Sequence, residues 1–139
     1  MSEPIPEQPP ARRHFLDYLV REGFRPRLMA DGDIVFHFEG REYFLQWDEG
    51  DPQLVRIALV NFRPVENEDD FQKVAVAAQE VTRRIKVVKM YATGDDTWCV
   101  VELFLPEPER LTDVFGRSLS AIRSSLATFE MALAGKLTD

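Results

Sequence analysis

Apolar residues recur at helical spacing in three stretches of the chain. The first predicted helix covers residues 11–22, and Gly23 follows it at the position that favours a left-handed cap. The second covers residues 67–83, where Asn67 followed by Asp70 resembles an N-terminal capping arrangement. In the third, residues 111–133, apolar side chains step by three or four positions, which predicts one long amphipathic helix.

Between these helices the pattern changes to an alternation of period two, which is typical of strands. Asp31-Gly32 and Glu39-Gly40 interrupt the alternation, and because Asp-Gly is a strong signal for a tight reversal, two successive hairpins are predicted. The predicted strands are residues 27–30, 33–38, 43–47, 54–62, 85–92 and 97–105. The order helix, four strands, helix, two strands, helix lacks a repeated strand–helix alternation. We therefore predict an α+β fold in which helices pack against an antiparallel sheet.

The chain has 139 residues, the length of one domain. Its first ten residues include four prolines, which lack backbone donors and bias their neighbours to extended conformations. We expect a disordered proline-rich leader at residues 1–10 and a single domain at 11–139. The leader has neither the basic region nor the apolar run of a signal peptide, and no apolar stretch approaches the ~20 residues of a membrane span. A cytoplasmic protein with no membrane partner is expected.

Composition narrows the classes of partner. The chain is 45% hydrophobic with 10 Phe, 3 Tyr and 2 Trp, which predicts a packed core. The formal net charge is −7, and such a field repels phosphate backbones, so no nucleic-acid partner is expected.

The sequence carries no recognisable catalytic motif. The sole thiol, Cys99, and the two histidines, His14 and His37, are the only candidates for nucleophilic chemistry. Cys99 lies in an apolar strand, where cysteine usually behaves as a small buried hydrophobe. We predict a protein that is not an enzyme, with no catalytic residues and no cofactor; a thiol activity would require Cys99 and His37 to be adjacent.

Acidic residues gather at three predicted reversals, residues 31–33, 48–51 and 95–96. Carboxylates brought together at one end of a sheet are ligands for a hard cation. Asp beside Gly or Pro is also favoured for its local hydrogen bonds, and we interpret the clusters as turns without a metal. A small-molecule or metal-sensing domain, which uses these turns or a pocket beneath the long helix, is the alternative function.

Several strands carry apolar residues on both faces, more than one face of a sheet packed by helices requires. This surplus predicts a surface for a protein or peptide partner. The candidate partner-binding residues are Phe44, Trp47, Val60, Phe62, Tyr91 and Trp98. A homodimer, formed through the apolar stripe of the last helix or the outward face of strand 54–62, is a further expectation.

The order of these segments resembles a known family. The resemblance rests on residues 15–24, 31–36, 43–45, 48–51, the strand through Leu59, Lys89-Met90-Tyr91 and the closing helix, within about residues 11–137. Together they are similar to the YbjN family of bacterial sensory transduction regulators. That resemblance implies a fold like that of type III secretion chaperones, which are small acidic α+β proteins, often dimeric, that hold a partner polypeptide in a non-native form. It implies a protein-binding or chaperone-like regulatory module and supplies no catalytic residues.

Overall fold

The computed structural model describes residues 10–48 and 50–138, so the predicted leader, apart from Pro10, lies outside the described residues. Three α-helices and six strands occur in the described part of the chain. They are α1 (Pro10–Arg21), β1 (Arg27–Leu28), β2 (Ile34–Phe38), β3 (Arg41–Asp48), β4 (Asp51–Leu59), α2 (Glu68–Arg84), β5 (Val88–Ala92), β6 (Thr97–Phe104) and α3 (Leu111–Leu133), which a short 3-10 turn, η1 (Pro108–Arg110), precedes.

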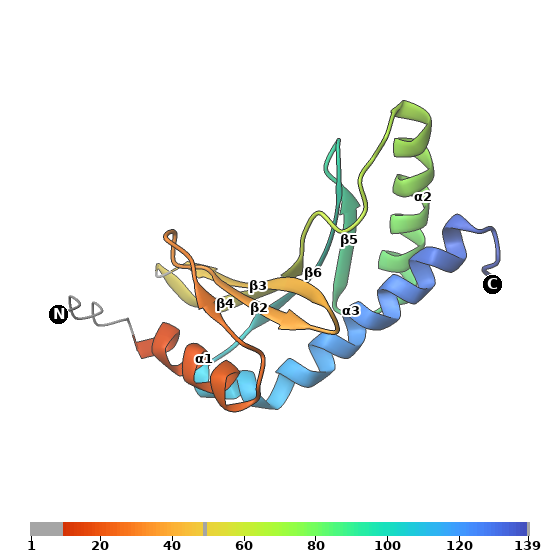
Figure 1. The fold of residues 1–139 in the computed structure, drawn as a ribbon. Helices are drawn as coiled ribbons and strands as arrows, with labels where there is room; N and C mark the ends of the chain where they lie inside the picture. Colours follow the sequence, from red (N-terminus) through yellow and green to blue (C-terminus); the bar gives the residue numbers. More distant parts are fainter. Residues whose placement is uncertain (1–9, 49, 139) are drawn as a thin grey trace.

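The strands form one antiparallel sheet in the order β1-β2-β3-β4-β6-β5. β5 is therefore an edge strand. The chain passes from β4 through α2 to β5, and β6 later inserts between these two strands. Figure 1 shows a strongly twisted sheet with α1 and α3 along one side and α2 beside β5. The α+β class and the predicted order of elements are confirmed.

Two tight reversals join the first strands as predicted. At Glu39-Gly40 both residues have positive φ, 50° and 78°, as a two-residue hairpin turn of the primed type requires. The reversal at Asp31-Gly32 places Gly32 at φ 97°. β1 is shorter than the predicted strand 27–30, because only Arg27 and Leu28 pair with β2.

The N-terminus of α2 is fixed by the predicted cap and by an ion pair. The Asn67 side chain accepts a 2.9 Å hydrogen bond from the Asp70 backbone N–H. Asp70 in turn accepts two hydrogen bonds from the Arg63 guanidinium, at 2.5 and 3.0 Å. These bonds, and one from the backbone of Glu66, lower the pKa of Asp70 to about 2. The loop after β4 is thereby tied to the first turn of α2.

The strands whose bounds differ most from the prediction are β4 and β5. β4 begins at Asp51 and ends at Leu59, whereas residues 54–62 were expected. Its pairing with β3 continues to the hairpin turn, and Asn61 takes a left-handed φ of 50°, which turns the chain out of the ladder before the apolar run ends. β5 begins only at Val88 because Val87 has a left-handed φ of 62°, which a strand does not accommodate.

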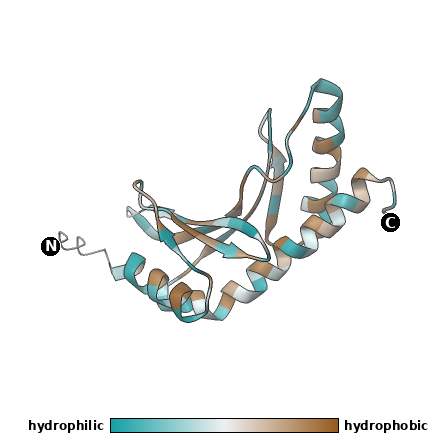
Figure 2. Ribbon diagram, in the orientation of Figure 1, coloured by the Kyte–Doolittle hydropathy of each residue, from teal (hydrophilic) through white to brown (hydrophobic). Residues whose placement is uncertain are grey.

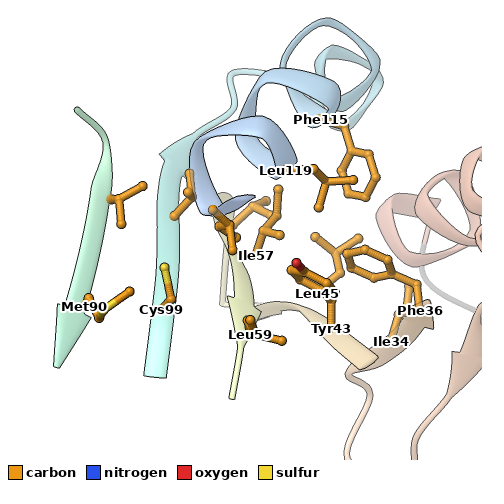
Figure 3. Close-up of a cluster of buried hydrophobic side chains, with 14 of the residues drawn as sticks. Ile34, Phe36, Tyr43, Leu45, Ile57, Leu59, Met90, Cys99, Phe115 and Leu119 are labelled. Carbon is orange, nitrogen blue, oxygen red and sulfur yellow. The ribbon is translucent and has the colours of Figure 1, made fainter. Parts of the chain in front are cut away.

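The core lies between the helices and one face of the sheet. Figure 3 shows side chains from neighbouring strands, among them Leu45, Ile57 and Cys99, directed towards Phe115 and Leu119 of α3. The long apolar stripe of α3 is therefore used within the monomer; its buried apolar members are Leu111, Phe115, Leu119, Ile122 and Phe129.

In α1 the buried side chains are Phe15, Tyr18 and Leu19, which follow i, i+3 and i+4 spacing. Val20, which shares the predicted apolar pattern, is 66% exposed. None of the helices built from the described residues is both long and apolar enough to cross a membrane.

Candidate functional site

The two faces of the sheet have different surroundings. Strand residues of one parity belong to the core cluster under the helices, while residues of the other parity lie outside that cluster. We call this second face the open face, because no helix in the described part of the chain covers it (Figure 1). Its residues on β2 to β6 are Val35, His37, Glu42, Phe44, Gln46, Leu54, Arg56, Ala58, Trp98, Val100, Glu102, Phe104, Lys89 and Tyr91.

A row of apolar side chains forms the floor of the open face. Val35, Phe44, Ala58 and Val100 are paired in sequence across β2, β3, β4 and β6. Val35, Ala58 and Val100 are at most 1% exposed although no helix covers them. Their longer neighbours in the same and adjacent rows shield them. The floor is thus a second, smaller apolar cluster on the side opposite the core.

An aromatic pair occupies one end of the open face. Trp98 of β6 and Tyr91 of β5 are cross-strand partners with ring centroids 6.1 Å apart. The indole N–H of Trp98 donates a 3.0 Å hydrogen bond to the side chain of Asn61, the residue that turns the chain out of the sheet after β4. This bond fixes the indole against the sheet and leaves part of the ring exposed.

A charged triad lies in the middle of the open face. Glu102 of β6 pairs with Lys89 of β5 at 2.5 Å and with Arg56 of β4 at 3.3 Å. Hydrogen bonds from Lys89 and, more weakly, from Arg56 lower the pKa of Glu102, so this carboxylate is ionised at neutral pH. The triad carries one net positive charge and places donors beside the apolar floor.

The other end of the open face is apolar and exposed. Phe104, at the end of β6, is 84% exposed, and its cross-strand partner Leu54 is 37% exposed. Phe104 is the most exposed large hydrophobic side chain of the described residues. The four outward residues of β6, Trp98, Val100, Glu102 and Phe104, therefore run from an aromatic end through a charged centre to an unshielded apolar end.

At the β5 edge of the sheet, a side chain from α2 forms hydrogen bonds with the backbone of the strand. The Thr82 hydroxyl of α2 accepts a 3.0 Å hydrogen bond from the Met90 backbone N–H and donates a 3.3 Å bond to the Met90 carbonyl. Met90 is the central residue of β5, and these are the groups that an added strand would need.

At the opposite edge β1 has only two paired residues. Beyond it, the carbonyl of Phe24 accepts a 2.9 Å hydrogen bond from the outward N–H of His37 in β2. At each edge the outward backbone of one residue is therefore already paired, and the side chains of the open face are the larger surface available for contact.

The structure separates the six candidate partner-binding residues into two groups. Phe44, Tyr91 and Trp98 lie on the open face, and Val60, just beyond β4, continues its alternation. The other two lie on the helix-packed side. Trp47 packs edge-on against Phe15 of α1 at 5.0 Å, and Phe62 packs against Phe129 of α3 at 5.7 Å.

Sequence reasoning missed Phe104 and Leu54. Both lie in predicted strands, 54–62 and 97–105, but neither was among the six candidate partner-binding residues. The signal that was available is their position in the alternation, because Phe104 shares the parity of Trp98 and Glu102.

Cys99 and His37 are not adjacent. Cys99 is fully buried on the core face of β6, and burial raises the pKa of its thiol to about 12 although a hydrogen bond with Ser125 opposes that shift. His37 lies on the open face of β2, where its Nε2 atom is 3.5 Å from a carboxylate oxygen of Glu42. Two strands and the thickness of the sheet separate them, so the condition for a thiol activity is not met.

The acidic turns use their carboxylates locally. The side chains of Asp31, Asp48 and Asp96 accept hydrogen bonds of 2.9 to 3.0 Å from the backbone N–H of Asp33, Gly50 and Thr97. Over residues 10–48 and 50–138, no three His, Cys, Asp or Glu side chains form a group able to hold a metal ion.

A hollow of about 500 Å³ lies at the end of the sheet beside η1 and the start of α1. Trp47 forms one wall, and the Arg12 guanidinium lies 5.2 Å from the centre of its ring. The other described residues that line it are Pro10, Ala11, Pro52, Gln53, Pro106 and Pro108. The hollow borders Trp47, one of the predicted site residues, and does not lie beneath α3.

Comparison with known proteins adds no identity: no protein-family model matches the chain and no curated protein matches it. The resemblance to the YbjN family therefore stays a prediction. What can be inferred about function comes from the surface just described.

Proposed function

We propose that this domain is a protein-binding module that holds an apolar segment of another protein on the open face, with β6 as the centre of the site. The observation that carries the proposal is Phe104, a phenylalanine that is 84% exposed beside Leu54, which is 37% exposed, on a face that no described helix covers. Burying a phenylalanine side chain contributes roughly 1.5–3 kcal/mol, so its exposure is a cost that a bound partner removes.

The arrangement along β6 defines the chemistry of the partner. An apolar side chain of the partner covers Phe104 and Leu54, and polar groups of the partner meet the triad of Arg56, Glu102 and Lys89. Trp98 and Tyr91 supply a second apolar contact at the far end. Anchors at both ends of a strand with charges between them suit a protein segment and give it a direction.

The mode of binding is contact with side chains and not strand addition. Thr82 occupies the outward groups of Met90 at one edge, and Phe24 occupies the outward N–H of His37 at the other. A module of this kind, which shelters apolar segments of a partner, agrees with the chaperone-like regulatory role that the YbjN resemblance implies. On that resemblance we place it in the bacterial cytoplasm.

A capture experiment with matched variants tests the proposal. The wild-type chain, Phe104→Glu and Val20→Glu are immobilised at equal density and exposed to native lysate, and bound proteins are quantified by mass spectrometry. Val20 is 66% exposed on α1, so its substitution adds the same charge to another exposed apolar site, away from the open face. We expect a reproducible set of proteins that Val20→Glu retains and Phe104→Glu loses by at least tenfold.

A chemically unfolded model client gives a second readout. Suppression of its aggregation at micromolar concentrations should follow the same order, with Phe104→Glu least effective. Equal capture and equal suppression by wild type and Phe104→Glu, with both chains folded by circular dichroism, would contradict the proposal.

The hollow beside Trp47 favours a second candidate function, the sensing of a small apolar molecule. Its volume of about 500 Å³ is within the range of ligand sites, roughly 300–1,000 Å³, and its walls are mainly proline and tryptophan. A ligand raises the melting temperature by mass action, so a thermal-shift screen of metabolites tests this candidate. A true hit should lose its shift in Trp47→Ala, whereas a shift retained there would place the ligand elsewhere.

A further inference from the structure

Three of the seven exposed large hydrophobic residues of the described chain gather at one end of the sheet. Leu54 and Phe104 are cross-strand partners on β4 and β6. Val87, which is 63% exposed, directly precedes β5, and the first pair of β5 with β6 is Val88 with Val101, three residues before Phe104. The start of β5 and the end of β6 therefore share one end of the sheet.

One bound segment can reach all three of these side chains. Consecutive Cα atoms are about 3.8 Å apart and paired Cα atoms of an antiparallel ladder about 5 Å apart, so the Cα atom of Val87 lies within about 10 Å of that of Val101. Phe104 is three residues further along β6, or about 10 Å. The two ends of this patch are thus at most about 20 Å apart, a distance that an extended segment of about six residues spans.

The backbone of Val87 is unfavourable for its side chain. Its φ of 62° lies in the left-handed region, which β-branched residues rarely adopt. Three other non-glycine residues of the described chain have a positive φ, namely Arg25, Glu39 and Asn61, and none of them is β-branched. Of these four positions, Val87 is the one where the residue type fits the backbone least.

The packing of Val87 does not offset this cost. Ile85 and Val88 on either side of the link pack against the core, whereas the side chain of Val87 is directed to solvent for most of its surface. Glycine or asparagine would adopt the same backbone at a lower cost. A residue that breaks a local rule without a gain in the folded chain is a candidate for a functional role.

The start of β5 is also basic. Lys86 is exposed and makes no ion pair with the described residues. Hydrophobic and hydrophilic residues alternate along β5 (Figure 2), and Lys89, the first hydrophilic one, belongs to the triad on the open face, which carries one net positive charge. Lys86 adds a second positive charge beside Val87.

The opposite side of the apolar patch is acidic. Asp48 and Asp51 at the β3–β4 hairpin line a hollow of about 350 Å³ together with Leu54. The charge at this end of the sheet therefore changes from negative at the hairpin to positive at the start of β5. A partner that carries a negative charge must place it on the β5 side.

We propose that the partner site on the open face extends to Lys86 and Val87, and that the bound segment carries an acidic side chain beside the apolar one that covers Val87. These contacts rest on the proposed function, because they belong to the same bound segment. Apolar contact with Val87 supplies the gain that the folded chain alone lacks. A carboxylate between Lys86 and Lys89 complements the positive charge there, so the partner is an acidic and apolar segment of another protein.

A panel of synthetic peptides tests the extended site. Each fluorescein-labelled peptide of about 15 residues carries two phenylalanines three to seven positions apart, and the residues that flank them are glutamate, glutamine or lysine in otherwise identical peptides. Fluorescence anisotropy at low salt gives the dissociation constants. We expect the wild-type chain to bind its best glutamate peptide at least fivefold more tightly than the lysine counterpart, with a preference that salt reduces.

Val87→Asn gives two readouts of opposite sign. It relieves the left-handed backbone, so the melting temperature should rise, and it removes the apolar contact, so the best glutamate peptide should bind at least fivefold more weakly. A purely structural role would change the melting temperature alone. Lys86→Glu should abolish the preference for glutamate over lysine. The controls Val20→Asn and Lys136→Glu make the same exchanges at exposed positions on α1 and beyond α3, and neither should change binding by more than about twofold.

Phe104→Glu separates the extended site from the proposed function. Peptide binding that is lost in Phe104→Glu but unchanged in Val87→Asn and Lys86→Glu would overturn the extended site and leave the open-face proposal intact. Binding that Phe104→Glu retains would overturn both. A panel in which no peptide binds the wild-type chain at 1 mM would overturn the extended site, and so would a lower melting temperature of Val87→Asn, because Val87 would then carry no strain.

Discussion

Replacing Thr82 by valine removes a hydroxyl and keeps the shape of the side chain. In the folded protein that hydroxyl accepts a 3.0 Å hydrogen bond from the Met90 N–H and donates a 3.3 Å bond to the Met90 carbonyl. Helix propensity changes little between threonine and valine. Thr82→Val therefore isolates the contact between α2 and the edge of the sheet.

The two hydrogen bonds determine how much stability Thr82→Val should lose. A typical bond contributes about 0.5–1.5 kcal/mol net, so two of them bound the loss at roughly 1–3 kcal/mol. The contact is only partly buried, and water can reach the freed backbone groups of Met90. We therefore expect the free energy of unfolding to fall by about 1–2 kcal/mol.

Urea denaturation gives this free energy, and Thr128→Val is the control. Thr128 is a partly buried helix residue of α3 whose hydroxyl makes no hydrogen bond with the described residues. Its replacement should change the free energy by less than about 0.5 kcal/mol. Hydrogen exchange adds a local readout, since the Met90 amide should lose protection more than the amides of Lys89 and Tyr91. Equal stability of wild type and Thr82→Val, with unchanged exchange at Met90, would show that α2 does not close this edge.

Two further predictions concern single groups. The pKa of Cys99 is raised by burial from 9.0 to about 12, so the folded state retains a proton that the unfolded chain loses above pH 9, and stability falls as the pH rises from 9 towards 12. At about 1.4 kcal/mol per pH unit, wild type should lose roughly 2 kcal/mol more than Cys99→Ala between pH 9 and 10.5, and parallel urea-derived stability profiles would contradict this. Val87→Asn places a residue that tolerates the left-handed region at φ 62° and should raise the melting temperature, with a gain of about 1 kcal/mol in calorimetry; a lower melting temperature would show that Val87 is not strained.

The fold was predictable where local chemistry and long-range pattern agree. Glu39-Gly40 supplies the turn, Asn67 supplies the helix cap, and the spacing in residues 111–133 supplies the long helix. Prediction failed where tertiary contacts decide. The apolar run of residues 54–62 continues beyond the point where Asn61 leaves the ladder. Asparagine tolerates the left-handed region, but its apolar neighbours led us to continue the strand through it.

The candidate site was predictable in type and only partly in position. Apolar residues on both faces of the strands indicated a second surface, and Phe44, Tyr91 and Trp98 lie on it. Alternation alone cannot say which face the helices cover, so Trp47 shared the candidate list although it packs on Phe15. Phe104 was missed because its exposure depends on the absence of a covering element, which no sequence pattern records.

The position of the open face follows from where the helices pack. The apolar stripe of α3 packs into the core, and Thr82 of α2 bonds to the edge of β5, so neither helix covers the open face. The apolar side chains of the open face are therefore shielded by other side chains of the sheet, and Val35, Ala58 and Val100 form a buried floor there. Phe104, at the end of β6, lies beyond that floor, and its side chain is not shielded from solvent. An apolar residue in that position is stabilised only by contact with another molecule, and for this reason we place the binding site there and not at either edge of the sheet.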